Sequence, residues 1–199
     1  MREVAVKVGK ALSEMSLEEL WQLFPIILTE HKDYWKEWYR EEEERLRAVL
    51  PLDRICRMSH IGSTSIPHIW AKPTIDILIE VKRGGSYQAI KEIILQQGYT
   101  CMSEETNRIS FNKGYTENGF AEKVYHLHLR EKGDHDELYF RDYMIDHPHR
   151  AKEYEKLKLD LWEVYEHNRD GYTNAKADFV TNYTEQGKRL YKGRYEQEK

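Results

Sequence analysis

Residues 60–81 read HIGSTSIPHIWAKPTIDILIEV, and the last eight of them form the clearest strand pattern in the chain. Successive side chains of a strand point to opposite faces of a sheet. One predicted face consists of Ile75, Ile77, Ile79 and Val81, and the other of Thr74, Asp76, Leu78 and Glu80. Burying a carboxylate is costly unless it is paired or binds a metal ion. Asp76 is therefore a candidate functional residue.

A short turn precedes this strand, with the sequence Gly62-Ser63-Thr64-Ser65. Glycine lets the backbone approach a phosphate closely, and the hydroxyl groups of serine and threonine add hydrogen-bond donors. The same string is also typical of an ordinary turn. The presence of Asp76 shortly afterwards favours a phosphate site, because a carboxylate opposite such a loop can hold a metal ion that accompanies the phosphate.

The segments around this stretch predict an α+β fold, with a small mixed sheet flanked by N-terminal and C-terminal helices. Apolar residues recur at helical spacing in residues 17–24, after Ser16 as a plausible N-cap, and again in residues 32–50. Residues 108–112 and 123–130 predict a hairpin, because the segment between them is rich in turn-forming glycine and asparagine. From residue 136 onward the pattern is helical. This order of elements is typical of α+β folds rather than of an α/β repeat.

Three segments are expected along the chain. Residues 1–30 form an N-terminal helical extension, in which residues 3–8 allow a short strand or a loose terminus. Residues 31–185 form the domain that carries the motifs. Residues 186–199 form a polar C-terminal tail, which we expect to fray after Gly187.

Composition limits the class of protein. The chain has 199 residues, 33% of them charged, and a formal net charge of −4, which argues against general nucleic-acid binding. No apolar run approaches the roughly 18 residues that span a bilayer, so no membrane partner is expected. Two cysteines, Cys56 and Cys101, are too few for a disulfide framework and favour a reducing cytoplasm. The sequence predicts no oligomeric state.

Two groups of motifs carry a resemblance to a known family. The first is His60-Ile61-Gly62-Ser63-Thr64-Ser65-Ile66-Pro67 with Ala71-Lys72-Pro73-Thr74-Ile75-Asp76-Ile77, and the second is Tyr125-His126-Leu127-His128-Leu129 with Phe140-Arg141-Asp142-Tyr143 and residues 154–158. Over roughly residues 30–185 the chain resembles the GrpB family, although His68 stands where glycine often follows the proline. The resemblance implies the nucleotidyltransferase fold superfamily, with a Gly-Ser motif and acidic strand residues that hold divalent metal ions.

The acidic pair that this resemblance implies is incomplete here. The superfamily pattern has two carboxylates two residues apart on one strand, a separation of about 6.6 Å. The first position is Asp76, but the second is Leu78, which cannot bind a metal ion. Glu80 shares the predicted face but lies about 13 Å along the strand, too far to complete one tight site.

Two histidines offer a substitute for the missing carboxylate. His126 and His128 alternate onto one face of the strand predicted for residues 123–130, and the resemblance places a further acidic position on a later strand. Asp76, His126 and His128 are therefore the predicted catalytic and metal-binding residues, for a divalent ion such as Mg²⁺, Mn²⁺ or Zn²⁺. The alternative is that both histidines are hydrogen-bonding residues of a polar cleft without a metal.

Positive side chains must neutralise any bound phosphate. The predicted nucleotide- or phosphate-binding residues are Gly62, Ser63, Thr64, Ser65, Lys72, Arg108 and Arg141, with Lys158 and Lys176 as further candidates. For each basic residue a surface ion pair is the alternative.

Two functions follow from these residues. The first is a metal-dependent nucleotidyltransferase that uses a nucleoside triphosphate and an unknown acceptor, with His126 or His128 completing the metal site or serving as general base. The alternative, which Leu78 favours, is a non-catalytic module that binds a nucleotide or another phosphate-bearing small molecule. An interaction protein without a ligand is a weaker third. The first two functions require the two histidines and Asp76 to meet across a cleft at the Gly62-Ser63 turn.

Overall fold

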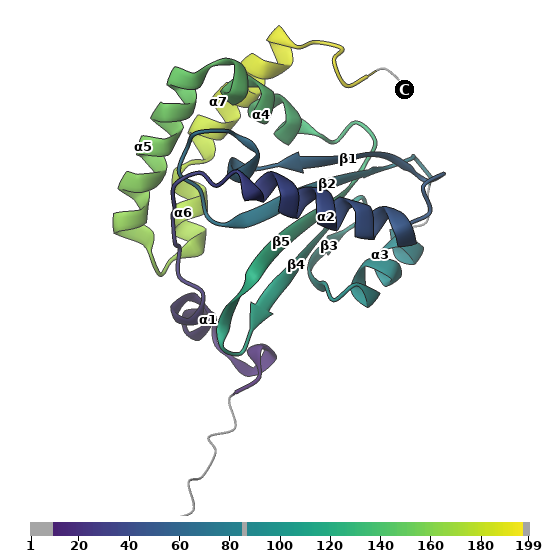
Figure 1. Ribbon diagram of the computed structural model, residues 1–199, viewed down its shortest axis with the longest axis horizontal. Coiled ribbons are helices and arrows are strands. Elements are labelled where there is room, and N and C mark those ends of the chain that lie inside the picture. Colours follow the sequence, from purple (N-terminus) through teal and green to yellow (C-terminus); the bar gives the residue numbers. More distant parts are fainter. Residues whose placement is uncertain (1–9, 85–86, 197–199) are drawn as a thin grey trace, which may run out of the picture.

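A computed structural model describes residues 10–84 and 87–196 of the chain (Figure 1). The strands are β1 (Ile55–Ile61), β2 (Thr74–Val81), β3 (Thr100–Glu105), β4 (Arg108–Thr116) and β5 (Gly119–Glu131). The helices are α1 (Leu17–Leu23), α2 (Tyr34–Val49), α3 (Tyr87–Gln96), α4 (Asp136–Asp146), α5 (Pro148–Tyr165), α6 (Arg169–Ala175) and α7 (Ala177–Leu190), with short 3-10 turns η1 (Leu12–Glu14) and η2 (Ser63–Ser65). None of the helices in the described residues is long and apolar enough to cross a membrane.

The strands form one mixed sheet in the order β1-β2-β5-β4-β3 (Figure 1). β2 and β5 are parallel, and the other neighbouring pairs are antiparallel. A parallel pair needs a long connection between its strands, and here α3 and the β3–β4 hairpin supply it. The predicted α+β class, with a small mixed sheet flanked by helices, is confirmed.

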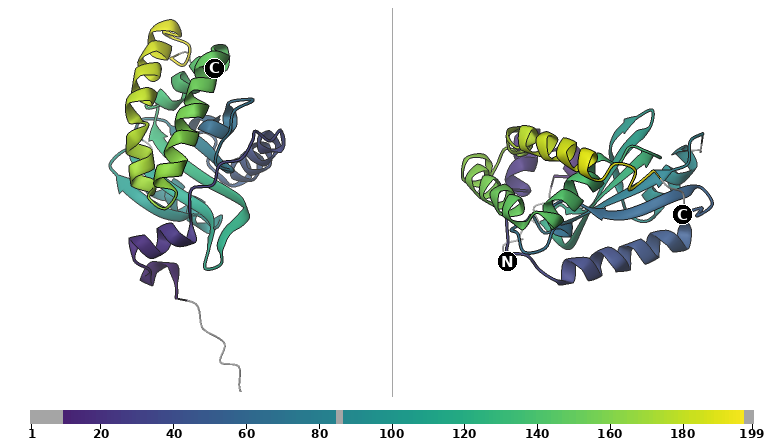
Figure 2. Two further views of the ribbon diagram at one scale, coloured as in Figure 1. Left: turned by 90° about the vertical axis from the view of Figure 1, so that its left-hand side faces the viewer. Right: turned by 90° about the horizontal axis from the view of Figure 1, so that it is seen from above.

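The two faces of β2 have different neighbours. Ile75, Ile77 and Ile79 are fully buried in the main core, together with Trp35 of α2 and Ile90 of α3. Side chains at the even positions of β2 face α4 and the C-terminal helices instead, and Leu78 packs there with Leu138. Figure 2 shows α2 on one side of the sheet and the C-terminal helices on the other. We call the side that carries Asp76 and Leu78 the α4 face.

Several predicted elements are confirmed, and two strands were not predicted. α1 begins after Ser16, whose side chain accepts a hydrogen bond from the backbone of Glu19 while the Glu19 carboxylate accepts one from Ser16. β4 and β5 form the predicted hairpin, although both are longer than expected. The sequence analysis assigned neither β1 nor β3 as a strand. β3 reads TCMSEE and lies at the sheet edge, where an exposed strand lacks the apolar alternation that identifies a buried one.

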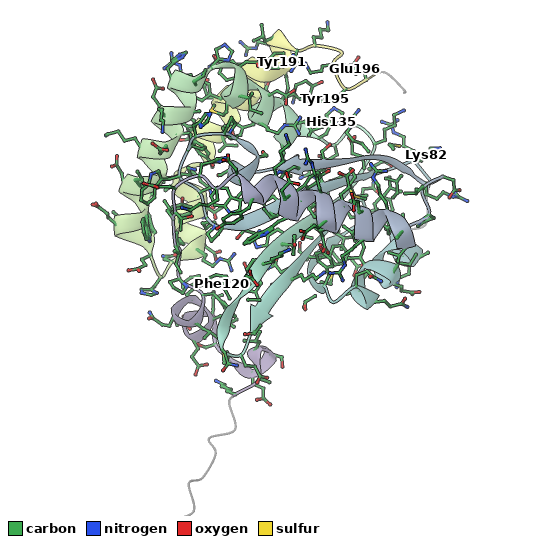
Figure 3. All side chains as sticks on the ribbon, viewed as in Figure 1. Lys82, Phe120, His135, Tyr191, Tyr195 and Glu196 are labelled. Carbon is green, nitrogen blue, oxygen red and sulfur yellow. The ribbon has the colours of Figure 1, made fainter. Side chains whose placement is uncertain are left out.

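The prediction that the chain frays after Gly187 is wrong for the described residues. α7 continues to Leu190, and Tyr191 is buried with its hydroxyl donating to Asp146 at 2.6 Å. Tyr195 packs edge-on against His135, with ring centroids 5.4 Å apart, and Figure 3 shows both side chains beside the returning C-terminal segment. Two tyrosines therefore anchor a segment whose polar composition suggested a tail. The expected division at residue 186 falls inside α7.

Part of the expected N-terminal extension belongs to the packed structure. Ile26 and Leu28 are buried, and the backbone of Ile26 donates to the carbonyl of Glu166 at 2.8 Å. Thr29 forms a β-bridge with Ala71, which ties this segment to the loop before β2. Residues 3–8, for which a strand was considered, lie outside the described residues.

The contact between α4 and α7 generates a stability prediction. Gly187 is buried, and a Cβ atom there would lie 2.5 Å from the carbonyl oxygen of Tyr139. Alanine in an open helical position is more favourable than glycine by about 0.5–1 kcal/mol. Gly187→Ala should instead lower the free energy of unfolding by about 1–3 kcal/mol, because the helices must separate.

Urea denaturation measures this change. Arg189→Ala, at an exposed position of the same helix, is the matched control and should alter the unfolding midpoint little. An unchanged or higher midpoint for Gly187→Ala would contradict the close packing of the two helices.

Candidate functional site

The turn after β1 lies directly against Asp76. Ile61, the last residue of β1, pairs with Asp76, so the chain leaves the sheet beside this carboxylate. Gly62 has φ of 71°, and a Cβ atom there would lie 2.1 Å from Asp76 Oδ2. Glycine is therefore required both for the left-handed backbone and for the close approach of the turn to the carboxylate.

The hydroxyl groups of the turn have two different roles: some form hydrogen bonds within the protein, and one lines a cavity. The Thr64 hydroxyl donates to the carbonyl of Thr74 at 2.9 Å, and the Ser65 hydroxyl donates to the carbonyl of Gly62 at 2.6 Å. These two predicted phosphate-binding residues thus hold the turn in place. Gly62 and Ser63 line the adjoining cavity.

The register of the sheet brings both histidines to Asp76. Asp76 pairs with His126 across β2 and β5, and Leu78 pairs with His128, so all four side chains lie on the α4 face. His126 Nδ1 lies 3.2 Å from Asp76 Oδ1, and His128 Nε2 lies 3.6 Å from the same oxygen. Asp76, His126 and His128 therefore lie together, as the sequence analysis required.

Hydrogen bonds use both ring nitrogens of His126. Arg169 donates to the Tyr115 hydroxyl at 3.0 Å, and that hydroxyl lies 2.8 Å from His126 Nε2. The Tyr115 hydroxyl therefore donates its own proton to His126 Nε2. The proton of the imidazole ring then lies on Nδ1, and this N–H donates to Asp76. Burial lowers the pKa of His126 despite the nearby carboxylate, so the ring is neutral. An ionised Asp76 requires the same tautomer, because a ring lone pair facing the carboxylate would be repulsive.

His128 presents an N–H group to Asp76. An arginine nitrogen can only donate, and Arg130 lies 3.3 Å from His128 Nδ1. His128 Nδ1 therefore accepts from Arg130, and the N–H on Nε2 faces Asp76. Burial alone would raise the pKa of Asp76, but the N–H groups of the two histidines lower it far below its usual range. The carboxylate is ionised.

These residues do not fit the metal site that the resemblance implies. Neither histidine offers a free lone pair on the side of Asp76. Leu78 is fully buried in a small apolar cluster, and the Glu80 carboxylate already accepts from Arg57 at 2.8 Å and contacts His135 at 2.7 Å. In the part of the chain that the structure describes, no group of three or more His, Cys, Asp or Glu side chains is placed to hold a metal ion.

A cavity of about 610 Å³ opens above these residues, between the α4 face of the sheet and the C-terminal helices. Four basic residues line it, each from a different segment: Lys72 before β2, Lys158 on α5, Arg169 at the start of α6, and Lys176 between α6 and α7. Asp76 is the acidic residue among them. The other acidic lining residues, Asp136, Glu137 and Glu185, come from α4 and the far half of α7. Lys176 and Glu185 are separated by about 13 Å along the helix, so the cavity has a basic end beside Asp76.

Two of the lysines form no ion pair, although Asp76 lies near enough to attract both. Within residues 10–84 and 87–196 the ammonium groups of Lys72 and Lys176 form no hydrogen bond or ion pair, and both lie against the ring of Tyr172, 5.7 Å and 4.6 Å from its centroid. Lys158 is 1% exposed and donates to the carbonyl of Trp70. Burial, reinforced by neighbouring positive charges, lowers the pKa of Lys72 to about 7. Burial likewise lowers the pKa of Lys158 to about 7 and that of Lys176 to about 8.

Two predicted phosphate-binding residues lie elsewhere. Arg108 forms a two-bond ion pair with Asp134, at 2.7 Å and 2.6 Å, and does not line the cavity. Arg141 donates to the carbonyl of His60 at 2.8 Å and to Asp142 at 2.7 Å. The structure therefore does not bring either arginine to the site.

The sequence analysis missed two residues of the site. Arg169 and Tyr115 lie outside the motifs, and no local pattern marks them. They connect to Asp76 through His126. Their role depends on a contact between α6 and the β4–β5 hairpin, which is formed only in the folded chain.

The lowered lysine pKa values predict a pH dependence of stability in the absence of ligand. Between pH 7 and about 10 the unfolded chain binds more protons at Lys72 than the folded chain does, because the ordinary pKa of lysine is 10.5. The free energy of unfolding therefore rises with pH over this range. Lys72→Met should be more stable than the unchanged protein at pH 7, and its stability should rise less with pH.

Thermal and urea unfolding from pH 7 to about 9.5 test this prediction. Lys156→Met, at an exposed position of α5, is the control and should keep the original pH dependence. Parallel stability curves for the Lys72 variant and the unchanged protein would show that Lys72 is protonated in the folded cavity.

Comparison with known proteins identifies relatives over most of the chain. The family model described as GrpB protein matches residues 25–186. The UPF0157 protein YqkA of Bacillus subtilis (strain 168) is 37% identical over 192 residues, which cover 95% of this chain and 54% of YqkA. The chain thus spans about half the length of that relative. The glutamate-rich protein GrpB of Alkalihalophilus pseudofirmus is 33% identical over 161 residues, which cover 78% of this chain and 91% of that protein.

The comparison with solved structures also identifies a GrpB protein. The crystal structure of the conserved protein GrpB from Enterococcus faecalis matches with a TM-score of 0.73 at 27% identity, over 83% of this chain and 99% of that one. Structures of the Cid1 poly(U) polymerase match with a TM-score of 0.41 at 14% identity, a likeness too weak to support any argument about this chain. The family model and the relatives together show that the chain belongs to the GrpB family.

Proposed function

We propose that the cavity binds a small molecule that carries one or more phosphate groups, with a nucleotide as the form that the superfamily implied by the GrpB motifs favours. The observation that carries this proposal is the set of basic residues beside the Gly62-Ser63 turn. Among the described residues Lys72 and Lys176 form no hydrogen bond or ion pair there, and Arg169 has only the Tyr115 hydroxyl as a hydrogen-bond acceptor. Partly buried charges that form no ion pair are costly, and a phosphate would pair with them.

Each basic residue would contribute differently to phosphate binding. The guanidinium of Arg169 uses one of its nitrogens for Tyr115, which leaves further N–H groups for a two-bond contact with phosphate oxygens. Lys72 and Lys176 would act as mobile point charges. Ser63 adds a hydroxyl at the cavity wall. These residues together would bind the phosphate group, and the other walls of the cavity would contact the rest of the ligand.

The remaining walls allow a ligand larger than phosphate alone. The cavity volume of about 610 Å³ lies within the range of about 300–1,000 Å³ that is typical of small-molecule sites. Phe140 and Val180 supply an apolar surface, and Thr181 and Thr184 supply hydroxyl groups. A nucleoside has both apolar faces and hydrogen-bonding edges, which suits such a lining.

Nucleotidyl transfer is a second candidate, and one observation favours it. A further cavity of about 630 Å³ lies between α1 and strands β3 and β4, and it shares Arg169 and Thr173 with the first. An acceptor in this second cavity would lie beside a nucleotide in the first. Its hydroxyl oxygen would attack the α-phosphorus, the bond from that phosphorus to the bridging oxygen would break, pyrophosphate would leave, and the hydroxyl proton would pass to solvent water. That this reaction uses a divalent metal ion stays a prediction. We propose the cytoplasm as the location of the protein.

Ligand binding tests the first function. Isothermal titration should show binding of ATP and of pyrophosphate, and none of adenosine, because the basic residues recognise phosphate. Lys176→Met should weaken ATP binding by about tenfold or more, since a charge-assisted contact contributes about 1.5–3 kcal/mol. Lys156→Met is the control on the outer surface and should bind normally. Equal binding of adenosine and ATP, or no binding of any ligand, would refute the proposal.

Pyrophosphate release tests the second function. Unchanged protein is assayed with a panel of nucleoside triphosphates and candidate acceptors in the presence of Mg²⁺ or Mn²⁺. If it releases pyrophosphate, Asp76→Asn should abolish the release, because the ionised carboxylate is lost at nearly constant volume. Full activity in this variant would remove Asp76 from the chemistry. Binding without release would leave the cavity as a binding module.

A further inference from the structure

We infer that the cavity binds its phosphate ligand without a divalent metal ion, because Lys72, Lys176 and Arg169 supply the positive charge that the resemblance assigns to metal ions. This inference rests on the proposed binding of a phosphate-bearing ligand. It differs from that proposal in one respect: phosphate binding alone does not decide whether the counter-charge comes from a metal ion or from the protein.

The hydrogen-bond pattern argues against metal ligation by the histidines. To bind a metal through Nε2, His128 would have to lose the proton that its contact with Arg130 places there. His126 would have to give up its contact with Tyr115 or with Asp76. Either change leaves a partly buried polar group without its partner, which is unfavourable.

The charge distribution argues in the same direction. A divalent cation beside Asp76 would meet four basic side chains and one carboxylate at this end of the cavity. A phosphate or polyphosphate at the same place would be attracted by the lysines and by Arg169. The basic end is therefore complementary to a multivalent anion rather than to a cation.

This arrangement couples ligand binding to protonation of lysine. The groups that face the lysines, besides the lysines themselves, are Asp76 on β2, His126 and His128 on β5, Lys152, Tyr154 and Glu155 on α5, and Arg169 and Tyr172 on α6. In the free protein the pKa of Lys72 is about 7 and that of Lys176 about 8, so both lose protons as the pH rises above neutrality. A bound phosphate favours their charged forms, and binding therefore takes up protons.

The sign of the pH effect follows from this coupling. A phosphate monoester loses its second proton near pH 6, so above about pH 7.5 the charge of the ligand is nearly constant. Over this range affinity should fall as the pH rises, because binding requires protonation of lysines that are increasingly neutral. The decrease approaches tenfold per pH unit for each proton taken up.

The experiment compares ATP binding to the full-length chain in EDTA and in excess Mg²⁺ or Mn²⁺, by isothermal titration. We expect an affinity in EDTA equal to or higher than that with metal, since the metal ion neutralises phosphate charge that the lysines would otherwise meet. Binding that occurs only with metal would overturn the inference and leave the proposed function standing. No binding under either condition would overturn both.

A pH series in EDTA, from about pH 7.5 to about 9.5, is the second measurement. The unchanged protein should lose affinity across this range, whereas Lys72→Arg and Lys176→Arg should each lose less, because arginine stays charged. Lys156→Arg, outside the cavity, should behave like the unchanged protein. Thermal unfolding checks that each variant is folded. Affinity that does not change with pH in the unchanged protein, or equal pH dependence in all variants, would overturn the role given to the lysines.

Discussion

The structure of the site depends on keeping one carboxylate, that of Asp76, ionised in the interior. The hydrogen bonds from His126 and His128 lower the pKa of this carboxylate, and its position places three conditions on the surrounding chain. The turn after β1 must carry glycine at position 62, because any Cβ atom would overlap with the carboxylate. β5 must pair with β2 in the register that places His126 beside Asp76. The imidazole must then hold its proton on Nδ1, which requires Tyr115 and Arg169 on its other side.

The same hydrogen bonds decide what chemistry remains available. Because His126 donates to Asp76 and accepts from Tyr115, it acts as a positioning residue between the carboxylate and Arg169 rather than as a metal ligand or free base. His128 presents an N–H to the same carboxylate. Three lysines remain in the cavity wall with lowered pKa values, and two of them form no hydrogen bond or ion pair in the described parts of the chain. This electrostatic imbalance favours an anionic ligand.

Much of the fold follows from local sequence patterns. The mostly apolar run of residues 74–81, interrupted by Asp76 and Glu80, reflects burial of β2 on both faces, and the Asn118-Gly119 pair at the β4–β5 turn reflects the tight turn of a hairpin. β3 escaped prediction because an exposed edge strand carries no such apolar run. The C-terminal segment was misjudged because its mean polarity concealed Tyr191 and Tyr195, whose burial depends on α4 rather than on neighbours in sequence.

The sequence by itself determined that Asp76 lies on the same strand face as Leu78, and that His126 and His128 share a face of another strand. It also determined that a glycine, Gly62, lies in the turn before the strand of Asp76. These are consequences of the two-residue period of a strand and of glycine's freedom at positive φ. Only the tertiary structure decided that Arg169 and Lys176 join Asp76, that Arg108 and Arg141 do not, and which nitrogen of each histidine carries its proton. Those outcomes depend on charges and hydrogen-bond partners that come from distant segments, and no local period in the sequence records which segments will meet.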